Sequence, residues 1–205
     1  MSLIDVRGVR VDFPQGATTG HALADIDVSF DAGTITLLEG PSGSGKTTLL
    51  SVLGGLLRPH AGVVRIGADV LNHSDAKALS RWRLRGVGFV FQAFRLFQHL
   101  SVLDNVALPL RLAGSPTRES DASARRALEQ VGMSAHASQP PSLLSGGEQQ
   151  RVAVARALVA SAPVILADEP TAALDADNGR DVADLLRAAA HGGAAVIVAS
   201  HDERL

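Results

Sequence analysis

Short runs of apolar residues, separated by glycine and polar residues, mark the first third of the chain. Residues 3–13 and 26–30 partly alternate between apolar and polar side chains, which predicts half-buried β-strands. Residues 35–38 are continuously apolar, as expected of a strand that is buried on both faces. Residues 49–57 have the spacing of a helix, and residues 63–66 predict a further strand. This part of the chain is therefore predicted to consist mainly of strands, with one helix among them.

A helix and a strand are predicted next. Residues 74–85 have the pattern of a helix, and Ser74 is the expected N-cap because its hydroxyl can accept a hydrogen bond from the first turn. Residues 87–91 predict a short strand that leads directly to Gln92.

Helical patterns dominate residues 93–143. Ser101 and Asp104 have the spacing of a helix start. Pro109 is expected to end or kink that helix, because proline lacks the N–H that a helix interior uses. A second helix is predicted over residues 117–131. We interpret this segment as a helical insertion into an α/β core.

The last third of the chain alternates between helices and strands. Helices are predicted over residues 145–160 and 181–190, and strands over residues 164–167 and 195–199. Strands that alternate with helices imply a mostly parallel sheet with helices on both faces. The predicted fold class is therefore α/β.

Composition and charge narrow the class of protein. The chain has 205 residues, of which 46% are hydrophobic, and its 19 Lys+Arg and 21 Asp+Glu give a formal net charge of −2. These values exclude intrinsic disorder and argue against a nucleic-acid protein that binds through a broad basic field. The sequence has no cysteine, which excludes disulfides and thiol catalysis. No apolar run approaches about 20 residues, so no segment is expected to span a membrane.

The turn after residues 35–38 fits the phosphate-binding pattern G-x-x-x-x-G-K-[ST] in full. Its glycines allow backbone N–H groups to surround phosphate oxygens, and the following helix directs its N-terminus at the anion. Lys46 can reach the β- and γ-phosphates, and the hydroxyl of Thr47 can hold Mg²⁺. The alternative is an ordinary glycine-rich turn with a solvated lysine, which the flanking strand and helix disfavour. The predicted ATP-binding residues of this loop are Gly40, Pro41, Ser42, Gly43, Ser44, Gly45, Lys46, Thr47 and Thr48.

Two adjacent carboxylates follow the buried strand predicted over residues 164–167. Because successive strand residues point in opposite directions, Asp168 and Glu169 are expected to have different roles. We assign Asp168 to the Mg²⁺ shell and Glu169 to polarising the attacking water. Many strands end in an acidic residue at a solvated edge, so the pair indicates catalysis only in combination with the phosphate loop.

A third candidate segment contains Leu144, Ser145, Gly146, Gly147 and Glu148. Ser145 and Glu148 have the spacing of a capping box, and for these residues alone we favour that structural interpretation. A cap does not require two glycines, however, and a serine followed by two glycines at a helix start also makes an anion site.

In combination, these motifs resemble the nucleotide-binding subunit of ABC transporters. The phosphate loop, Gln92, residues 144–148, the strand with its two carboxylates, Ala173-Leu174-Asp175 and His201 occur in the order and approximate spacing of that family. The resemblance covers essentially the whole chain. Within the family, residues 91–96 and 104–110 are most similar to the lipoprotein-releasing and macrolide-export group, which also includes the cell-division ATPase.

The resemblance implies roles for individual residues. Gln92 would contact Mg²⁺ or water, and the signature motif, residues 144–148, would cover the γ-phosphate of ATP bound to a second copy. Asp175 would lie at the interface between copies, His201 would contact the γ-phosphate, and Phe13 would stack on adenine. By residue type alone, Gln92 also fits a polar strand end, His201 an exposed side chain and Phe13 a half-buried strand residue. The implied catalytic residues are Glu169, His201, Gln92 and Lys46, and the implied Mg²⁺ ligands are Thr47, Gln92 and Asp168.

Three features depart from the family pattern. Glu148 stands where many members have Gln, which places a carboxylate near phosphates, although this subgroup often carries it. Phe13 lacks a hydroxyl, so only stacking remains to it. Family members usually continue with more strand and helix after His201, whereas this sequence ends at Leu205. A truncated sequence and a naturally short protein both remain open.

The resemblance implies a single ABC ATPase domain over residues 1–205, with a P-loop NTPase fold. Its mostly parallel central sheet would be joined by N-terminal antiparallel strands and a helical insertion. About residues 1–92 and 144–205 would form a RecA-like core with a β subdomain, and about residues 93–143 a helical subdomain.

The implied function is ATP hydrolysis, with Mg²⁺ as cofactor, that powers export or extraction of a substrate through a separate membrane permease. Two copies would pair head to tail around ATP, and no nucleic acid would bind. The implied location is the cytoplasm, peripheral on the inner face of a bacterial cell membrane. The main alternative is a soluble ABC-type ATPase that drives a cytosolic assembly such as iron–sulfur cluster biogenesis. A generic phosphate-loop kinase or GTPase is disfavoured, because it does not need residues 144–148 or His201 at these places.

Overall fold

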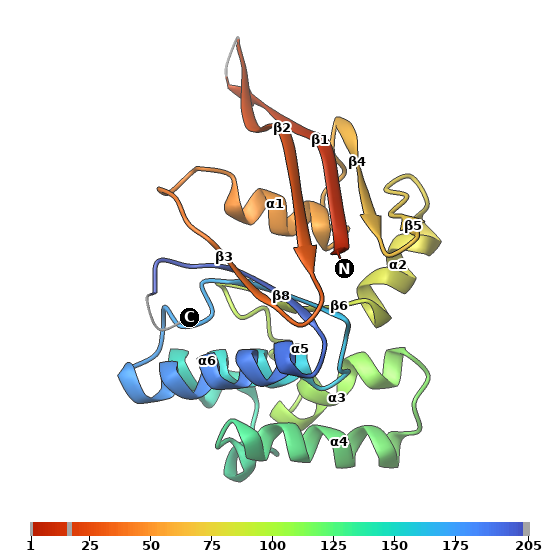
Figure 1. Ribbon diagram of the computed structural model, residues 1–205. Helices are drawn as coiled ribbons and strands as arrows, with labels where there is room; N and C mark the ends of the chain where they lie inside the picture. Colours follow the sequence, from red (N-terminus) through yellow and green to blue (C-terminus); the bar gives the residue numbers. More distant parts are fainter. Residues whose placement is uncertain (1, 16–17, 203–205) are drawn as a thin grey trace.

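The strands form two sheets in residues 2–15 and 18–202, the part of the chain that the computed structural model describes (Figure 1). The first sheet is antiparallel, with the strand order β2-β1-β4-β5. Its strands are β1 (Ser2–Gln15), β2 (Thr18–Asp31), β4 (Ala61–Ile66) and β5 (Asp69–Val70). The antiparallel N-terminal strands are therefore confirmed. β1 and β2 are longer than their patterns indicated, because they pair along most of their length around register shifts.

The second sheet is parallel, with the strand order β3-β8-β7-β6. Its strands are β3 (Ile35–Leu38), β6 (Val87–Val90), β7 (Val164–Asp168) and β8 (Ala195–Ala199). The two central strands, β7 and β8, are buried at every position, which explains their continuous apolar runs.

Helices cover both faces of the parallel sheet (Figure 1). On one face, Leu166 of β7 joins a buried cluster with α1 (Lys46–Leu53). On the other face, its neighbour Ile165 joins a cluster with α5 (Gly146–Leu158) and α6 (Ala176–His191). Successive β7 side chains thus pack in opposite directions, and the sheet has the double cover that the alternating pattern predicted.

The helix predicted over residues 49–57 differs at both ends. It begins at Lys46, directly after Gly45, and ends at Leu53 before Gly54. The apolar periodicity begins only at Leu49, because the first turn faces the phosphate loop and carries polar residues. Gly54 and the left-handed Gly55 then end the helix.

The predicted cap of the next helix is wrong by one residue. α2 (Ala76–Arg85) is capped by Asp75, whose Oδ1 accepts hydrogen bonds from the N–H groups of Lys77 at 2.8 Å and Ala78 at 3.0 Å. A carboxylate at this position also interacts favourably with the helix dipole, which a serine hydroxyl does not.

α3 (Val102–Leu112) begins where the sequence indicated. The Ser101 Oγ accepts a hydrogen bond from the Asp104 N–H at 3.0 Å. Pro109 does not end this helix. It removes only its own N–H, and the next turn still forms, since the Ala113 N–H donates to the Pro109 carbonyl at 3.0 Å.

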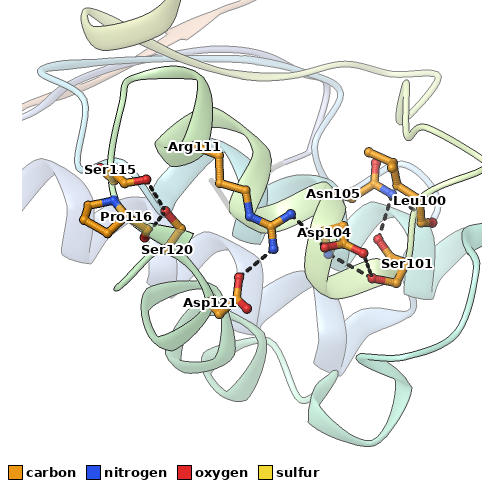
Figure 2. Close-up of polar contacts among 9 residues, drawn as sticks. All are labelled: Leu100, Ser101, Asp104, Asn105, Arg111, Ser115, Pro116, Ser120 and Asp121. Atoms are coloured by element: carbon orange, nitrogen blue, oxygen red, sulfur yellow. Dashed lines mark hydrogen bonds and ion pairs between the residues drawn. The ribbon is translucent and has the colours of Figure 1, made fainter. Parts of the chain in front are cut away.

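The helices between β6 and α5 pack around a further buried cluster, to which α5 also contributes, at the end of the molecule opposite the antiparallel sheet (Figure 1). This region contains α3, α4 (Thr117–Gln130) and the short 3₁₀ helices η1 (Ser134–His136) and η2 (Pro141–Leu143). Arg111 holds α3 against α4, because its guanidinium donates to Asp104 Oδ1 at 2.8 Å and to Asp121 Oδ1 at 2.6 Å (Figure 2). The buried side chain of Asn105 bonds both the N–H and the carbonyl of Phe97. It thereby attaches the segment after β6 to α3.

In the described part of the chain, no helix combines the length and the apolar character needed to cross a membrane.

Candidate functional site

The glycine-rich loop between β3 and α1 wraps around the side chain of Lys46. Its Nζ donates to the carbonyl oxygens of Gly40 at 2.6 Å and Pro41 at 3.1 Å. Gly45, the N-cap of α1, has a φ of 93°, and a Cβ there would lie 2.3 Å from the Ala22 carbonyl oxygen. Only glycine fits at this position, so the loop can bring its backbone N–H groups close to an anion.

The predicted catalytic and Mg²⁺-binding residues line one pocket of about 320 Å³ at the carboxyl ends of the parallel strands, whereas Gly40 and Pro41 of the predicted loop do not line it. The loop after β3 contributes Ser42, Gly43, Ser44, Gly45, Lys46, Thr47 and Thr48. Gln92 comes from the loop after β6, Glu169 follows β7, and His201 follows β8. Open parallel sheets bind ligands at this edge. Residues far apart in the sequence thus line a single pocket.

Thr47 and Asp168 lie in direct contact in this pocket. The Thr47 Oγ1 donates to Asp168 Oδ2 at 2.9 Å, and Asp168 is only 7% exposed. Mg²⁺ prefers oxygen ligands and usually completes its shell with water and substrate phosphates. The described residues contain no group of three or more His, Asp or Glu that could enclose a metal alone. One hydroxyl, one carboxylate and the amide oxygen of Gln92 fit an ion that is shared with a nucleotide.

Glu169 has different partners from Asp168, although both residues line the same pocket. Alternation along the strand does not account for this difference, because β7 ends at Asp168. Its φ of 48° turns the chain at the end of β7, and its N–H donates to the Ala199 carbonyl at 2.8 Å. Its carboxylate accepts a hydrogen bond from the hydroxyl of the buried Ser200 at 3.1 Å. No sequence motif marks Ser200, and only this tertiary contact reveals it.

Phe13 lies beside this pocket on β1. It is 45% exposed and lines an adjoining pocket of about 560 Å³, which also contains Thr47, Thr48 and Gln92. An exposed ring next to a phosphate loop is available for stacking on a flat base.

The signature motif lies apart from both pockets, since none of the residues 144–148 lines either of them. Ser145 and Glu148 form the capping box of α5, as the structural interpretation predicted. A Cβ on Gly147 would lie 3.2 Å from the Ala173 carbonyl oxygen, so this glycine packs closely against the segment before Asp175. Asp175 caps α6 by accepting a hydrogen bond from the Asn178 N–H at 2.9 Å.

Two further side chains of α5, which belong to no recognised motif, make tertiary hydrogen bonds. The side chain of Gln150, which is 1% exposed, donates to the Pro170 carbonyl at 2.9 Å. Arg156 donates to two carbonyls of the loop after β6. These residues fit an ordinary helical pattern, so only the tertiary contacts reveal them.

Comparison with known proteins shows the family and the fold of this chain. The family model described as ABC transporter matches residues 23–172. The chain belongs to the ABC transporter family. A dimeric structure of a bacterial ABC transporter cassette superimposes with a TM-score of 0.92 and 36% identity, covering 97% of this chain and 88% of that chain. A second structure shows that cassette in a post-hydrolysis state bound to ADP and Pi. The predicted ABC ATPase fold is confirmed.

Sequence relatives of this ABC chain include transporters of the macrolide-export type. It is 42% identical over 201 residues to the macrolide export ATP-binding/permease protein MacB of Rhodopseudomonas palustris, which covers 98% of this chain and 31% of MacB. An uncharacterised ABC transporter ATP-binding protein of Mycobacterium tuberculosis is 40% identical over 205 residues, which is all of this chain and 62% of that protein. The predicted likeness to the macrolide-export group is confirmed. The ABC chain spans less than two thirds of the length of these relatives.

The capping box of the signature motif makes the stability of the ABC chain depend on pH. The hydroxyl and the N–H of Ser145 both donate to Glu148 Oε2 at 2.8 Å and hold the pKa of that carboxyl below its ordinary value of 4.5. A lowered folded-state pKa contributes stability above the unfolded pKa, and the contribution is lost as pH falls through the folded value. We expect the wild type to lose more stability than Glu148→Gln between about pH 5 and pH 3, by at most about 1 kcal/mol. Urea unfolding across this pH range would measure it. Parallel curves for the two proteins would contradict the expectation.

Proposed function

We propose that this chain hydrolyses ATP and couples hydrolysis to movement of a substrate through a membrane permease. The observation that carries the proposal is the single pocket that contains Lys46, Thr47, Asp168, Glu169 and His201. A lysine in a glycine-rich loop, a hydroxyl–carboxylate pair and a second carboxylate are the groups that in-line phosphoryl transfer to water requires.

Each group has a defined part in this reaction. Lys46 neutralises charge on the β- and γ-phosphates, and the loop N–H groups bind their oxygens. Thr47, Asp168 and Gln92 would hold Mg²⁺, which supplies further positive charge to the phosphates. Glu169, positioned by the hydroxyl of Ser200, orients the attacking water and accepts its proton. His201, which also lines the pocket, binds the γ-phosphate, and Phe13 stacks on adenine.

The complete site requires a second copy of the chain. The signature motif lies outside the pocket of its own chain, and the cassette with a TM-score of 0.92 is dimeric. In a head-to-tail pair, residues 144–148 of one copy would cover the γ-phosphate bound to the other copy. Asp175, beside the signature motif, would lie at the contact between the copies. ATP would therefore stabilise the dimer that hydrolyses it.

The permease is proposed to bind near residues 92–105. Here an apolar groove of about 370 Å³ is lined by Phe97, Leu108 and Leu112, and Phe97 and Leu112 are 55% and 64% exposed. This groove adjoins the loop of Gln92, so movement at the ATP site can reach it. MacB, by its name, combines ATP-binding and permease parts. The proposed location is the cytoplasmic face of the cell membrane, and residues 93–143 are proposed as a helical subdomain between core and permease.

Purification of an ATP-trapped complex from the source cells would test this proposal. The variant Glu169→Gln is expected to retain ATP and to carry a multi-span permease out of detergent-solubilised membranes. Adding Lys46→Ala to the same chain removes ATP binding and is the matched control. A soluble scaffold in place of a permease would overturn the transport role and favour a cytosolic assembly ATPase.

A further inference from the structure

Arg156, in the last turn of α5, bonds the loop that carries Gln92. Its Nη1 donates to the Arg95 carbonyl at 2.6 Å, and its Nη2 donates to the Phe94 carbonyl at 2.8 Å. The two arms of one guanidinium thus hold two successive peptide groups. These groups lie 61 and 62 residues away in the sequence, only a few positions beyond Gln92.

The backbone that Arg156 holds is strained. Phe94 has a φ of 55° and Arg95 a φ of 50°, which places two consecutive residues with a Cβ in the left-handed region. Such conformations persist only where surrounding structure holds them. Burial lowers the pKa of Arg156 to about 10, so its guanidinium stays charged at neutral pH and binds the carbonyl dipoles strongly.

The same loop touches the first turn of α5. A Cβ on Gly146 would lie 3.8 Å from the Phe94 ring, and Phe94 packs against the buried cluster that contains Leu144. α5 therefore contacts the loop at both of its ends: through the signature motif at its start and through Arg156 at its last turn.

We propose that Arg156 is a positioning residue for ATP hydrolysis, which holds the left-handed backbone at Phe94 and Arg95 and thereby fixes Gln92 in the ATP pocket. This role rests on the proposed ATPase function. Through α5, Arg156 connects Gln92 to the signature motif. Gln92 contacts the ATP of its own chain, and the signature motif contacts the ATP of the second copy. The two sites of the dimer are then linked within each chain by one helix.

The substitution Arg156→Lys tests this role. Lysine keeps the charge, but one ammonium group cannot reproduce the planar fork that bonds two carbonyls. The loss of one charge-assisted hydrogen bond is expected to raise amide hydrogen exchange of residues 93–97 about tenfold and to lower kcat about tenfold. The Kd for ATP should change less than about twofold, because Lys46 and its loop are untouched.

The matched control is Arg111→Lys. Arg111 also joins two acceptors through one guanidinium, but it bonds Asp104 and Asp121 within the helical region (Figure 2). The Arg111→Lys variant is expected to have wild-type amide hydrogen exchange in residues 93–97 and a wild-type kcat. Equal amide hydrogen exchange in Arg156→Lys and wild type would show that Arg156 does not hold the backbone at Phe94 and Arg95. Raised exchange with an unchanged kcat would overturn the positioning of Gln92.

A second variant separates the backbone role from a general loss of stability. Glycine adopts a positive φ freely, so adding Arg95→Gly to Arg156→Lys is expected to recover part of the lost kcat. No recovery would overturn the role of the left-handed backbone. A wild-type chain that hydrolyses no ATP would overturn the proposed function instead. The exchange data alone would then decide whether Arg156 holds the backbone at Phe94 and Arg95.

Discussion

Replacing Glu169 by glutamine is expected to slow ATP hydrolysis by about 10²–10⁴-fold, because the amide cannot accept the proton of the attacking water. Glutamine has nearly the same shape, and its amide oxygen can still accept the hydrogen bond from Ser200. The phosphate loop is unchanged, so the Kd for ATP should stay within about threefold of wild type. Steady-state phosphate release and nucleotide binding measure the two quantities separately.

The same variant should accumulate as a dimer in ATP. Because ATP stabilises the pair and is no longer consumed, light scattering is expected to show twice the monomer mass with ATP and the monomer mass with ADP. Glu129→Gln is the matched control, since it changes an exposed glutamate of α4 far from the pocket. ATP hydrolysis at the wild-type rate by Glu169→Gln would show that Glu169 does not accept the proton of the attacking water. Asp168 would then be the carboxylate to test.

The parts of the site that the sequence predicted are those whose chemistry lies in a few consecutive residues. The phosphate loop and the pair Asp168–Glu169 each follow a recognisable apolar strand, so both their residue types and their place at one sheet edge could be inferred. The start of α1 was missed because its first turn faces the phosphate loop and does not share the apolar period that begins at Leu49.

The supporting contacts of the site could not be inferred in this way. Ser200 lies 31 residues from Glu169 in the sequence, and Arg156 lies 61 residues from Arg95. Neither residue type is unusual where it stands. Their roles arise from the parallel sheet and from α5, which bring distant segments together. The capping box at Ser145, in contrast, is local, and its prediction from the sequence was correct. The box did not explain the two glycines that follow Ser145, and these glycines lie against other parts of the chain.

Replacing Lys46 by alanine is expected to raise the Kd for ATP by about 100-fold or more. Hydrogen bonds to charged groups each contribute about 1.5–3 kcal/mol, and Lys46 can reach both the β- and the γ-phosphate. Isothermal titration with ATP would measure the change. Lys77→Ala is a direct control, because Lys77 is the other lysine of the sequence and is exposed on α2.

The lysine also supports the loop itself, which makes a second variant informative. Its Nζ bonds the carbonyls of Gly40 and Pro41, so Lys46→Ala removes two loop contacts together with the charge. Lys46→Arg retains a charge and donors for these carbonyls, but its larger planar head occupies the space where the phosphates bind. Weak ATP binding by both variants, with thermal stability close to wild type for Lys46→Arg, would assign the loss to the phosphate contacts. Wild-type affinity in both would mean that this loop does not bind the nucleotide.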